Sequence, residues 1–172
     1  AATMNKAKAA DTSGLIVCMH GITSSEFDFR TCMEGWAKAG IRAAEPDLVK
    51  AREHEMANGP GSARRLMDDL GLVAYSSTNQ LRLEETSDAR AQAVEDLKWK
   101  VAMAESLGAT RIVIPSAASA NHVLADYGEV RANLYECGEI AKPHNVALMV
   151  EFTRNSRLIN NVRTCLDVVR RL

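Results

Sequence analysis

A short glycine or asparagine joint recurs along the chain and constrains its fold more than any other feature. It lies at Ala39-Gly40-Ile41, Leu70-Gly71-Leu72, Leu107-Gly108-Ala109 and His144-Asn145-Val146. In each joint the glycine or asparagine can adopt the left-handed conformation that ends a helix, and an apolar stretch then begins. The chain therefore repeats one supersecondary unit, in which a helix is followed by a strand.

Short apolar stretches are the expected strands. We expect them near residues 15–20, 41–45, 73–77, 111–115 and 146–151. Their almost uninterrupted apolar character is typical of parallel strands covered on both faces. Helical patterns lie between them, and the clearest repeats apolar residues at heptad-like spacing from Val94 to Leu107. A βα unit repeated in this way predicts an α/β fold with a mainly parallel sheet and right-handed crossovers.

Two architectures accommodate about five βα units. One is an open five-stranded doubly wound sheet of the flavodoxin type, which suits a chain of 172 residues. The other is part of a (β/α)8 TIM barrel, whose closed form needs eight units and ~250 residues. Length favours the open sheet, but the first βα joint lacks the glycine-rich phosphate loop expected of a flavin or nucleotide binder.

Composition indicates one soluble globular domain. Hydrophobic residues make up 47% of the chain and charged residues 25%, which is too apolar for intrinsic disorder. We expect residues 1–13 to form a flexible tail and residues 14–172 to form a single domain. The 21 basic and 22 acidic residues give a net charge of -1, which argues against a nucleic-acid or anionic-membrane binder. No apolar run approaches the roughly 18 residues of a membrane span.

Cysteine usage indicates the redox compartment. Cys18, Cys32, Cys137 and Cys165 form no CxxC pair and have no histidine at zinc-finger spacing. Each lies in an apolar run or at a helical core position. We therefore expect reduced, buried thiols in a cytoplasmic protein.

The later part of the chain resembles a known family. The segments LGATRIVIPSA, EVRANLYECGEIAKPHNVALMVEF and NNVRTCLDVVRRL follow one another in the order typical of the xylose-isomerase-like TIM-barrel superfamily. This superfamily includes tagatose 3-epimerases, inosose isomerases and dehydratases, and an endonuclease IV branch. The resemblance runs from about Leu15 to Leu172 and is strongest after Gly108. It implies that the chain is a partial barrel, the N-terminal five of eight βα units.

Glu151 is the first candidate for chemistry. It ends the last expected strand, where a carboxylate is costly unless it is paired, protonated or bound to a metal. A salt bridge to Arg154 or Arg157 is the structural alternative. The resemblance implies that Glu151 is a ligand of a divalent metal, Mn²⁺, Mg²⁺ or Co²⁺, and takes part in proton transfer through a metal-stabilised enediolate. The family's other ligands lie on later strands, so this chain alone should hold the metal weakly or not at all.

Five further residues are candidates for substrate binding. His20 and Glu45 end the first two expected strands, His122 lies in the loop after the fourth, and Arg154 and Arg157 suit an anionic group. A structural or solvated role is the alternative for each. The ketose epimerases have a second glutamate where this chain has Arg157, which argues against that branch. His54 lies in the polar stretch KAREHEM, and we expect it to be exposed.

The first functional hypothesis is a metal-dependent isomerase or epimerase of a sugar or cyclitol, or the N-terminal part of one. The second is a lyase or dehydratase of the same superfamily, and the third is a catalytically silent half-barrel that acts as an assembly module. An endonuclease is disfavoured, since the chain has only four histidines and no basic stripe for DNA. Open sheet edges predict a homo-oligomer or a partner chain that supplies the missing units.

Overall fold

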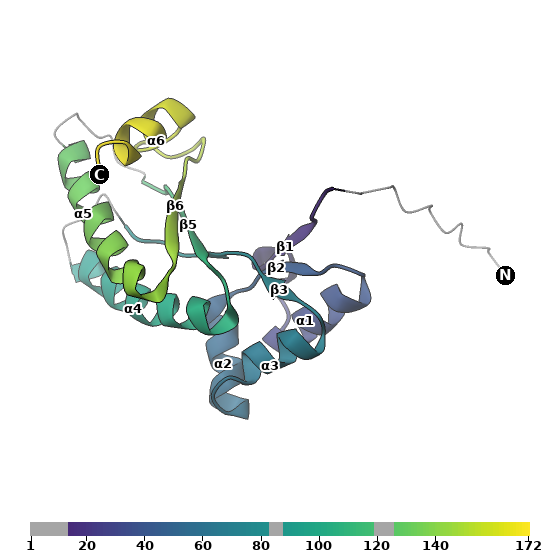
Figure 1. The fold of residues 1–172 in the computed structure, drawn as a ribbon. Helices are drawn as coiled ribbons and strands as arrows, with labels where there is room; N and C mark the ends of the chain where they lie inside the picture. The colour runs from purple at the N-terminus through teal and green to yellow at the C-terminus, as the bar shows by residue number, and fades with distance from the viewer. Residues whose placement is uncertain (1–13, 83–87, 119–125) are drawn as a thin grey trace.

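The computed structural model describes residues 14–82, 88–118 and 126–172, and the expected tail of residues 1–13 lies outside them. The described residues form an α/β fold (Figure 1). The strands are β1 (Cys18–His20), β2 (Ala43–Glu45), β3 (Val73–Ala74), β4 (Ser77–Thr78), β5 (Arg111–Pro115) and β6 (Ala147–Glu151). Each expected strand is therefore present, and the third is divided between β3 and β4.

All strand pairs are parallel, and neighbours follow the order of the chain. One three-stranded sheet runs β1-β2-β3 and a second runs β4-β5-β6. The interrupted third strand joins them, because Tyr75 N donates to Ala44 O at 2.9 Å and Asn79 N donates to Val113 O at 2.9 Å. A flavodoxin-like sheet would place the first strand between the second and third. The sequential order excludes that alternative, and the fold is a partial TIM barrel.

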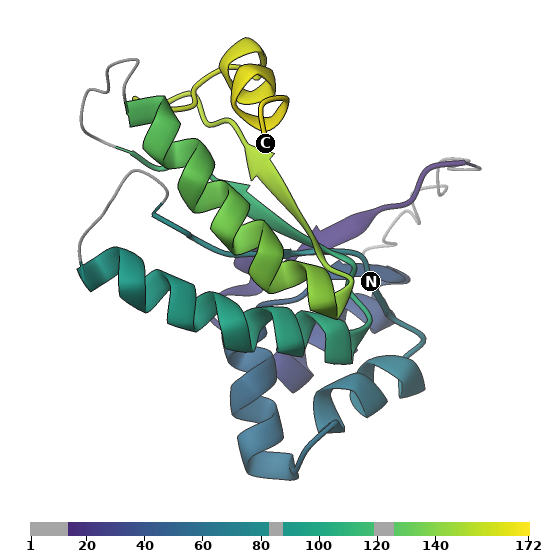
Figure 2. The same ribbon diagram turned by 60° about the vertical axis from the view of Figure 1, so that its left-hand side comes forward.

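The helices connect successive strands and lie along one side of them. They are α1 (Phe29–Lys38), α2 (Leu48–Asn58), α3 (Ser62–Asp69), α4 (Asp88–Leu107), α5 (Asp126–Ala141) and α6 (Val162–Val169), with 3-10 turns η1 (Gly21–Ser24) and η2 (Lys142–His144). Figures 1 and 2 show α4 and α5 side by side along β5 and β6, while α1, α2 and α3 group next to the first sheet. This is the arrangement of a barrel wall with its helices outside.

The predicted joints end helices as expected. Gly40, Gly71, Gly108 and Asn145 all have positive φ, between 54° and 83°. At Gly108 a side chain would also collide with a neighbour, because an added Cβ would lie 2.2 Å from the Arg64 guanidinium. That guanidinium donates to Leu107 O at 3.0 Å and so satisfies a carbonyl at the end of α4.

The hydrophobic core lies between the helices and the strand faces that point toward them. Ile112 and Ile114 of β5 are 0% and 1% exposed, and they share this core with Leu97 and Val101 of α4. Alternation along a strand sends the intervening residues to the opposite, inner face.

That inner face is open. Val73 is 54% exposed and Met149 is 37% exposed, although both are apolar strand residues. The expectation that the strands are covered on both faces is therefore wrong for this side. In the described residues no further strands lie across the inner face, whereas a closed barrel would fill it with side chains.

Two expectations about exposure are corrected by the packing. Cys18 is exposed, because it lies on the open side of β1, while Cys32, Cys137 and Cys165 are buried as predicted. His54 is buried rather than exposed, since α2 turns it toward the Phe29 ring of α1 with ring centroids 5.4 Å apart. Burial lowers the pKa of His54.

Candidate functional site

Polar side chains meet where β1, β2 and β4 end. His20, Glu45 and Thr78 are the last residues of these three strands. His20 and Glu45 are partners in the parallel register, so their side chains point to the same face. In parallel α/β folds ligands bind at the carboxyl ends of the strands, which is where these residues lie.

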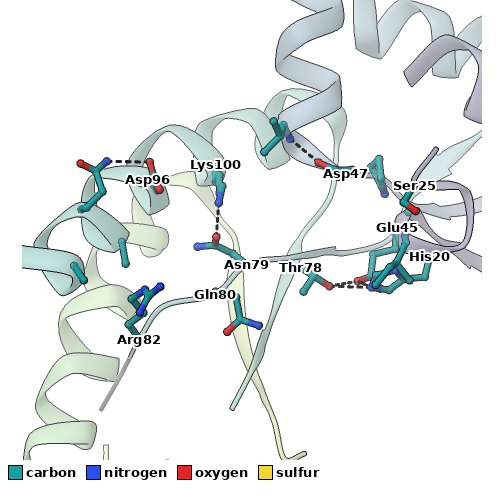
Figure 3. Close-up of a pocket in the computed structure, with 17 residues that line it drawn as sticks. His20, Ser25, Glu45, Asp47, Thr78, Asn79, Gln80, Arg82, Asp96 and Lys100 are labelled. Atoms are coloured by element: carbon teal, nitrogen blue, oxygen red, sulfur yellow. Dashed lines mark hydrogen bonds and ion pairs between the residues drawn. The ribbon is translucent and has the colours of Figure 1, made fainter. Parts of the chain in front are cut away.

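The Glu45 carboxylate is the centre of this group (Figure 3). The Thr78 hydroxyl donates to Oε1, and His20 Nε2 lies 3.2 Å from the same oxygen. Oε2 accepts a hydrogen bond from Ser76 Oγ at 2.9 Å. Side chains of β1, of β4 and of the residue just before β4 therefore fix the carboxylate, whose side chain is only 15% exposed.

Hydrogen bonding fixes the tautomer of neutral His20. Its Nδ1 accepts from the backbone N of Ile22 at 3.0 Å, so the ring proton is carried by Nε2. Nε2 lies within hydrogen-bonding distance of both Glu45 and Thr78 Oγ1, the latter at 3.3 Å. The side chain remains 44% exposed. An imidazole that is oriented and accessible beside a carboxylate can bind a substrate hydroxyl and hold or release a proton.

The three strand-end residues line a cavity of about 620 Å³. Its walls also include Ile22 of η1, Asp47 at the start of α2, and Asp96 and Lys100 of α4. This volume lies within the usual range of small-molecule sites, roughly 300–1,000 Å³.

Lys100 reaches the cavity from the middle of α4. Its Nζ donates to Asn79 Oδ1 at 2.6 Å (Figure 3). Burial lowers the pKa of Lys100, and the carboxylates of Asp96 and Asp47 oppose that effect. The cavity therefore has a second polar end, away from the Glu45 carboxylate.

Glu151 lies at the end of β6 beside Pro115. It is two residues beyond Met149 and so belongs to the same open inner face as Met149. Its side chain is exposed and has no ion pair or hydrogen bond with any residue in the ranges the structure covers. Glu151 therefore does not form the salt bridge to Arg154 or Arg157 that was the structural alternative. Glu151 does not line the cavity of His20 and Glu45.

The other candidates are not brought to this cavity. Arg154 and Arg157 are exposed in the segment after β6, where Arg157 N donates to Ala118 O at 2.9 Å. His122 lies outside the described residues. Of the expected site residues that the structure describes, only His20 and Glu45 share the cavity.

The residues described here do not by themselves form a metal centre. Nowhere in residues 14–82, 88–118 and 126–172 do three His, Cys, Asp or Glu side chains converge in a way that could hold a metal ion. Glu151 offers a single carboxylate, and a bound divalent cation needs several ligands. The donor set present does not fit a metal ion without additional ligands.

Sequence reasoning did not select Ser76, Thr78 and Lys100 as site residues. The polar run from Ser76 to Gln80, directly after an apolar strand, is a usable signal for the first two. Lys100 has no comparable local signal. It lies inside a helix, and only the packing of α4 against the third strand brings it to Asn79.

Comparisons with known proteins agree with this fold. The family model for the xylose isomerase-like TIM barrel matches residues 33–172. No curated protein matches the sequence.

Similar solved structures include the IolI protein with a bound zinc atom, at a TM-score of 0.77 and 14% identity, covering 91% of this chain and 59% of that one. The probable 3-DHS dehydratase AsbF from Bacillus anthracis has a TM-score of 0.76 and 14% identity, with coverage of 91% and 58%. An L-ribulose 3-epimerase has a TM-score of 0.69 and 20% identity, with coverage of 90% and 56%. The chain thus spans less than two thirds of the length of each.

None of the helices in the described residues has the length and apolar character needed to cross a membrane. The family model covers most of the chain, and the parallel strands follow one another in barrel order. The chain belongs to the xylose isomerase-like TIM barrel family.

Proposed function

We propose that this chain is the N-terminal part of a divalent-metal-dependent isomerase or epimerase that acts on a sugar or cyclitol. The observation that carries the proposal is the group of His20, Glu45 and Thr78, held together at the strand ends over a cavity of small-molecule size. The similarity of the chain to an L-ribulose 3-epimerase and to the IolI protein supports the proposal at the level of the fold.

Each strand-end residue has a proposed role. The oriented imidazole of His20 and the carboxylate of Glu45 bind substrate hydroxyl groups, because together they offer one donor and several acceptor sites. Glu151, unpaired on the same open face of the barrel wall, transfers the proton at the carbon next to the substrate carbonyl. His122, Arg154 and Arg157 are retained as proposed substrate contacts.

Glu151 is also proposed as one ligand of the metal, Mn²⁺, Mg²⁺ or Co²⁺. The remaining ligands would come from βα units beyond the described residues or from a partner chain. We propose a cytoplasmic protein that forms a homo-oligomer or pairs with a chain supplying those units. Among the described residues β1 and β6 each pair with a strand on one side only, and such open strand edges favour association with another chain.

Two other functions remain candidates. The likeness to AsbF favours a lyase or dehydratase that uses the same site. The open inner face with exposed Val73 and Met149 favours a catalytically silent assembly module.

A panel of substrates separates these candidates. The assembled fraction, identified by sedimentation, is incubated with L-ribulose, D-fructose and an inosose in the presence of each metal, and products are resolved by chromatography. We expect a new epimer or isomer peak that disappears in the Glu151→Gln variant. Loss of water from the substrate would favour the lyase, and an unchanged panel in the assembled protein would favour the module.

A further inference from the structure

The Asn79 side chain is buried, and only half of its amide is hydrogen bonded. Asn79 is 3% exposed and lines the cavity of His20 and Glu45. Its Oδ1 accepts from Lys100, and this contact fixes the amide orientation because an ammonium group can only donate. Nδ2 is left without a hydrogen-bond partner within the described ranges. A buried N–H group without a partner is costly, so a ligand atom that accepts from it is favoured.

Lys100 provides a second donor at the same place. Its ammonium carries three N–H groups, of which one is used by Asn79 Oδ1. The other described contact of Nζ is the Trp99 ring, whose centroid lies 5.4 Å away. Lys100 Nζ is hydrogen bonded to the Asn79 amide, and Nδ2 belongs to that same amide. One ligand group with two oxygens can therefore accept a hydrogen bond from each of these two nitrogens.

Hydrogen bonds hold one oxygen of each nearby carboxylate. Asp47 Oδ1 accepts from the backbone N of Val49 at 2.8 Å and caps α2. Asp96 Oδ1 accepts from Gln92 Nε2 at 3.3 Å. This end of the cavity thus combines the free N–H groups of Asn79 and Lys100 with two carboxylates that are held in place by hydrogen bonds. The two carboxylates also disfavour a doubly charged ligand, so a monoanion fits this end better than a phosphate dianion.

We propose that Asn79 and Lys100 form a subsite for the carboxylate of an acidic substrate. The molecule whose reaction is proposed above would then be a sugar acid or a related hydroxy acid, with its hydroxyl groups at His20 and Glu45. The choice of substrate rests on the proposed function, but the binding of the carboxylate does not require turnover.

Matched sugars test the subsite without any knowledge of the substrate. D-glucuronate, D-glucose and D-glucose 6-phosphate differ at one carbon, which carries a carboxylate, a hydroxyl or a phosphate. Their dissociation constants are measured with the ¹⁵N-labelled chain by NMR titration, for the wild type and for Lys100→Met and Asn79→Asp. Lys98→Met is the control, since Lys98 is exposed on the same helix and paired with Glu95. Thermal melts select conditions in which each variant is folded.

We expect glucuronate to bind about ten-fold more tightly than glucose, the effect of one charge-assisted hydrogen bond. Lys100→Met and Asn79→Asp should each abolish that preference and leave glucose binding unchanged, while Lys98→Met should have no effect. Equal binding of the three sugars, or none, overturns the proposal, and so does a Lys100-dependent preference for glucose 6-phosphate. If glucuronate is preferred but no isomerase activity is found, only the proposed function fails. If neutral sugars react and no carboxylate preference exists, only the subsite fails.

Discussion

Replacement of Glu45 tests whether the neighbouring side chains at the strand ends hold its carboxylate in place. In the wild type the carboxylate accepts from Ser76 and Thr78 and lies 3.2 Å from His20 Nε2. Glu45→Ala removes the acceptor for all three, and Ser76 is 9% exposed, so its hydroxyl has little access to water. A hydrogen bond to a charged group contributes about 1.5–3 kcal/mol. With part of the loss recovered by solvent at the half-exposed His20, we expect a fall of about 3 kcal/mol in the free energy of unfolding.

Glu45→Gln is the matched control. The amide oxygen can still accept from Thr78 and His20, and its N–H group can donate to the Ser76 hydroxyl, which rotates to accept. We expect a loss of about 1 kcal/mol, because only the charge is removed. Urea denaturation followed by circular dichroism measures both values. If Glu45→Ala costs no more than Glu45→Gln, the carboxylate is not organised by its neighbours, and the interpretation of this site is refuted.

Three further predictions concern burial, pH and the proposed ligand. Leu97→Ala should cost about 2–5 kcal/mol because Leu97 is fully buried, whereas Met149→Ala on the open face should cost less than about 1 kcal/mol; equal losses in urea denaturation would contradict the open face. Burial lowers the pKa of His54, so the unfolded state binds the proton more tightly and the free energy of unfolding should fall as the pH drops below about 6.5. The His54→Gln variant should therefore show a flatter pH dependence of the melting temperature, and an unchanged slope would contradict this prediction. Glu151→Gln should leave the midpoint without metal unchanged and remove any stabilisation by Mn²⁺ in the assembled protein; a collapsed midpoint would mean a structural role.

The repeated unit could be predicted from the sequence because it depends on local backbone requirements. The joint that ends each helix requires a left-handed residue, whatever the order of the strands in the sheet. The structure shows this conformation at Gly40, Gly71, Gly108 and Asn145. The choice between an open sheet and a barrel is different, because strand order depends on pairing across the fold. No residue pattern within β1 or β2 indicates whether β1 lies at the edge, as it does here.

The site was predictable only in part for the same reason. His20 and Glu45 are candidates because strand ends carry function in this class of fold, and their register confirms that they lie together. Lys100 depends on how α4 packs, and the burial of His54 depends on how α2 meets α1. Neither has a signal in the local sequence. The role of Glu151 stays a prediction, since no side chain in the described ranges pairs with it.

Incorporation of solvent deuterium into a sugar tests the central claim most directly. The assembled protein is incubated in D₂O with Mn²⁺ and each sugar of the panel, including glucuronate, and the carbon next to the carbonyl is followed by NMR. Proton transfer by a positioned carboxylate contributes about 10²–10⁴-fold to the rate. We predict deuterium at that carbon for at least one sugar, with the rate lowered by at least about 100-fold in Glu151→Gln at an unchanged melting temperature. No incorporation with the wild type, or an undiminished rate in Glu151→Gln, would contradict the account.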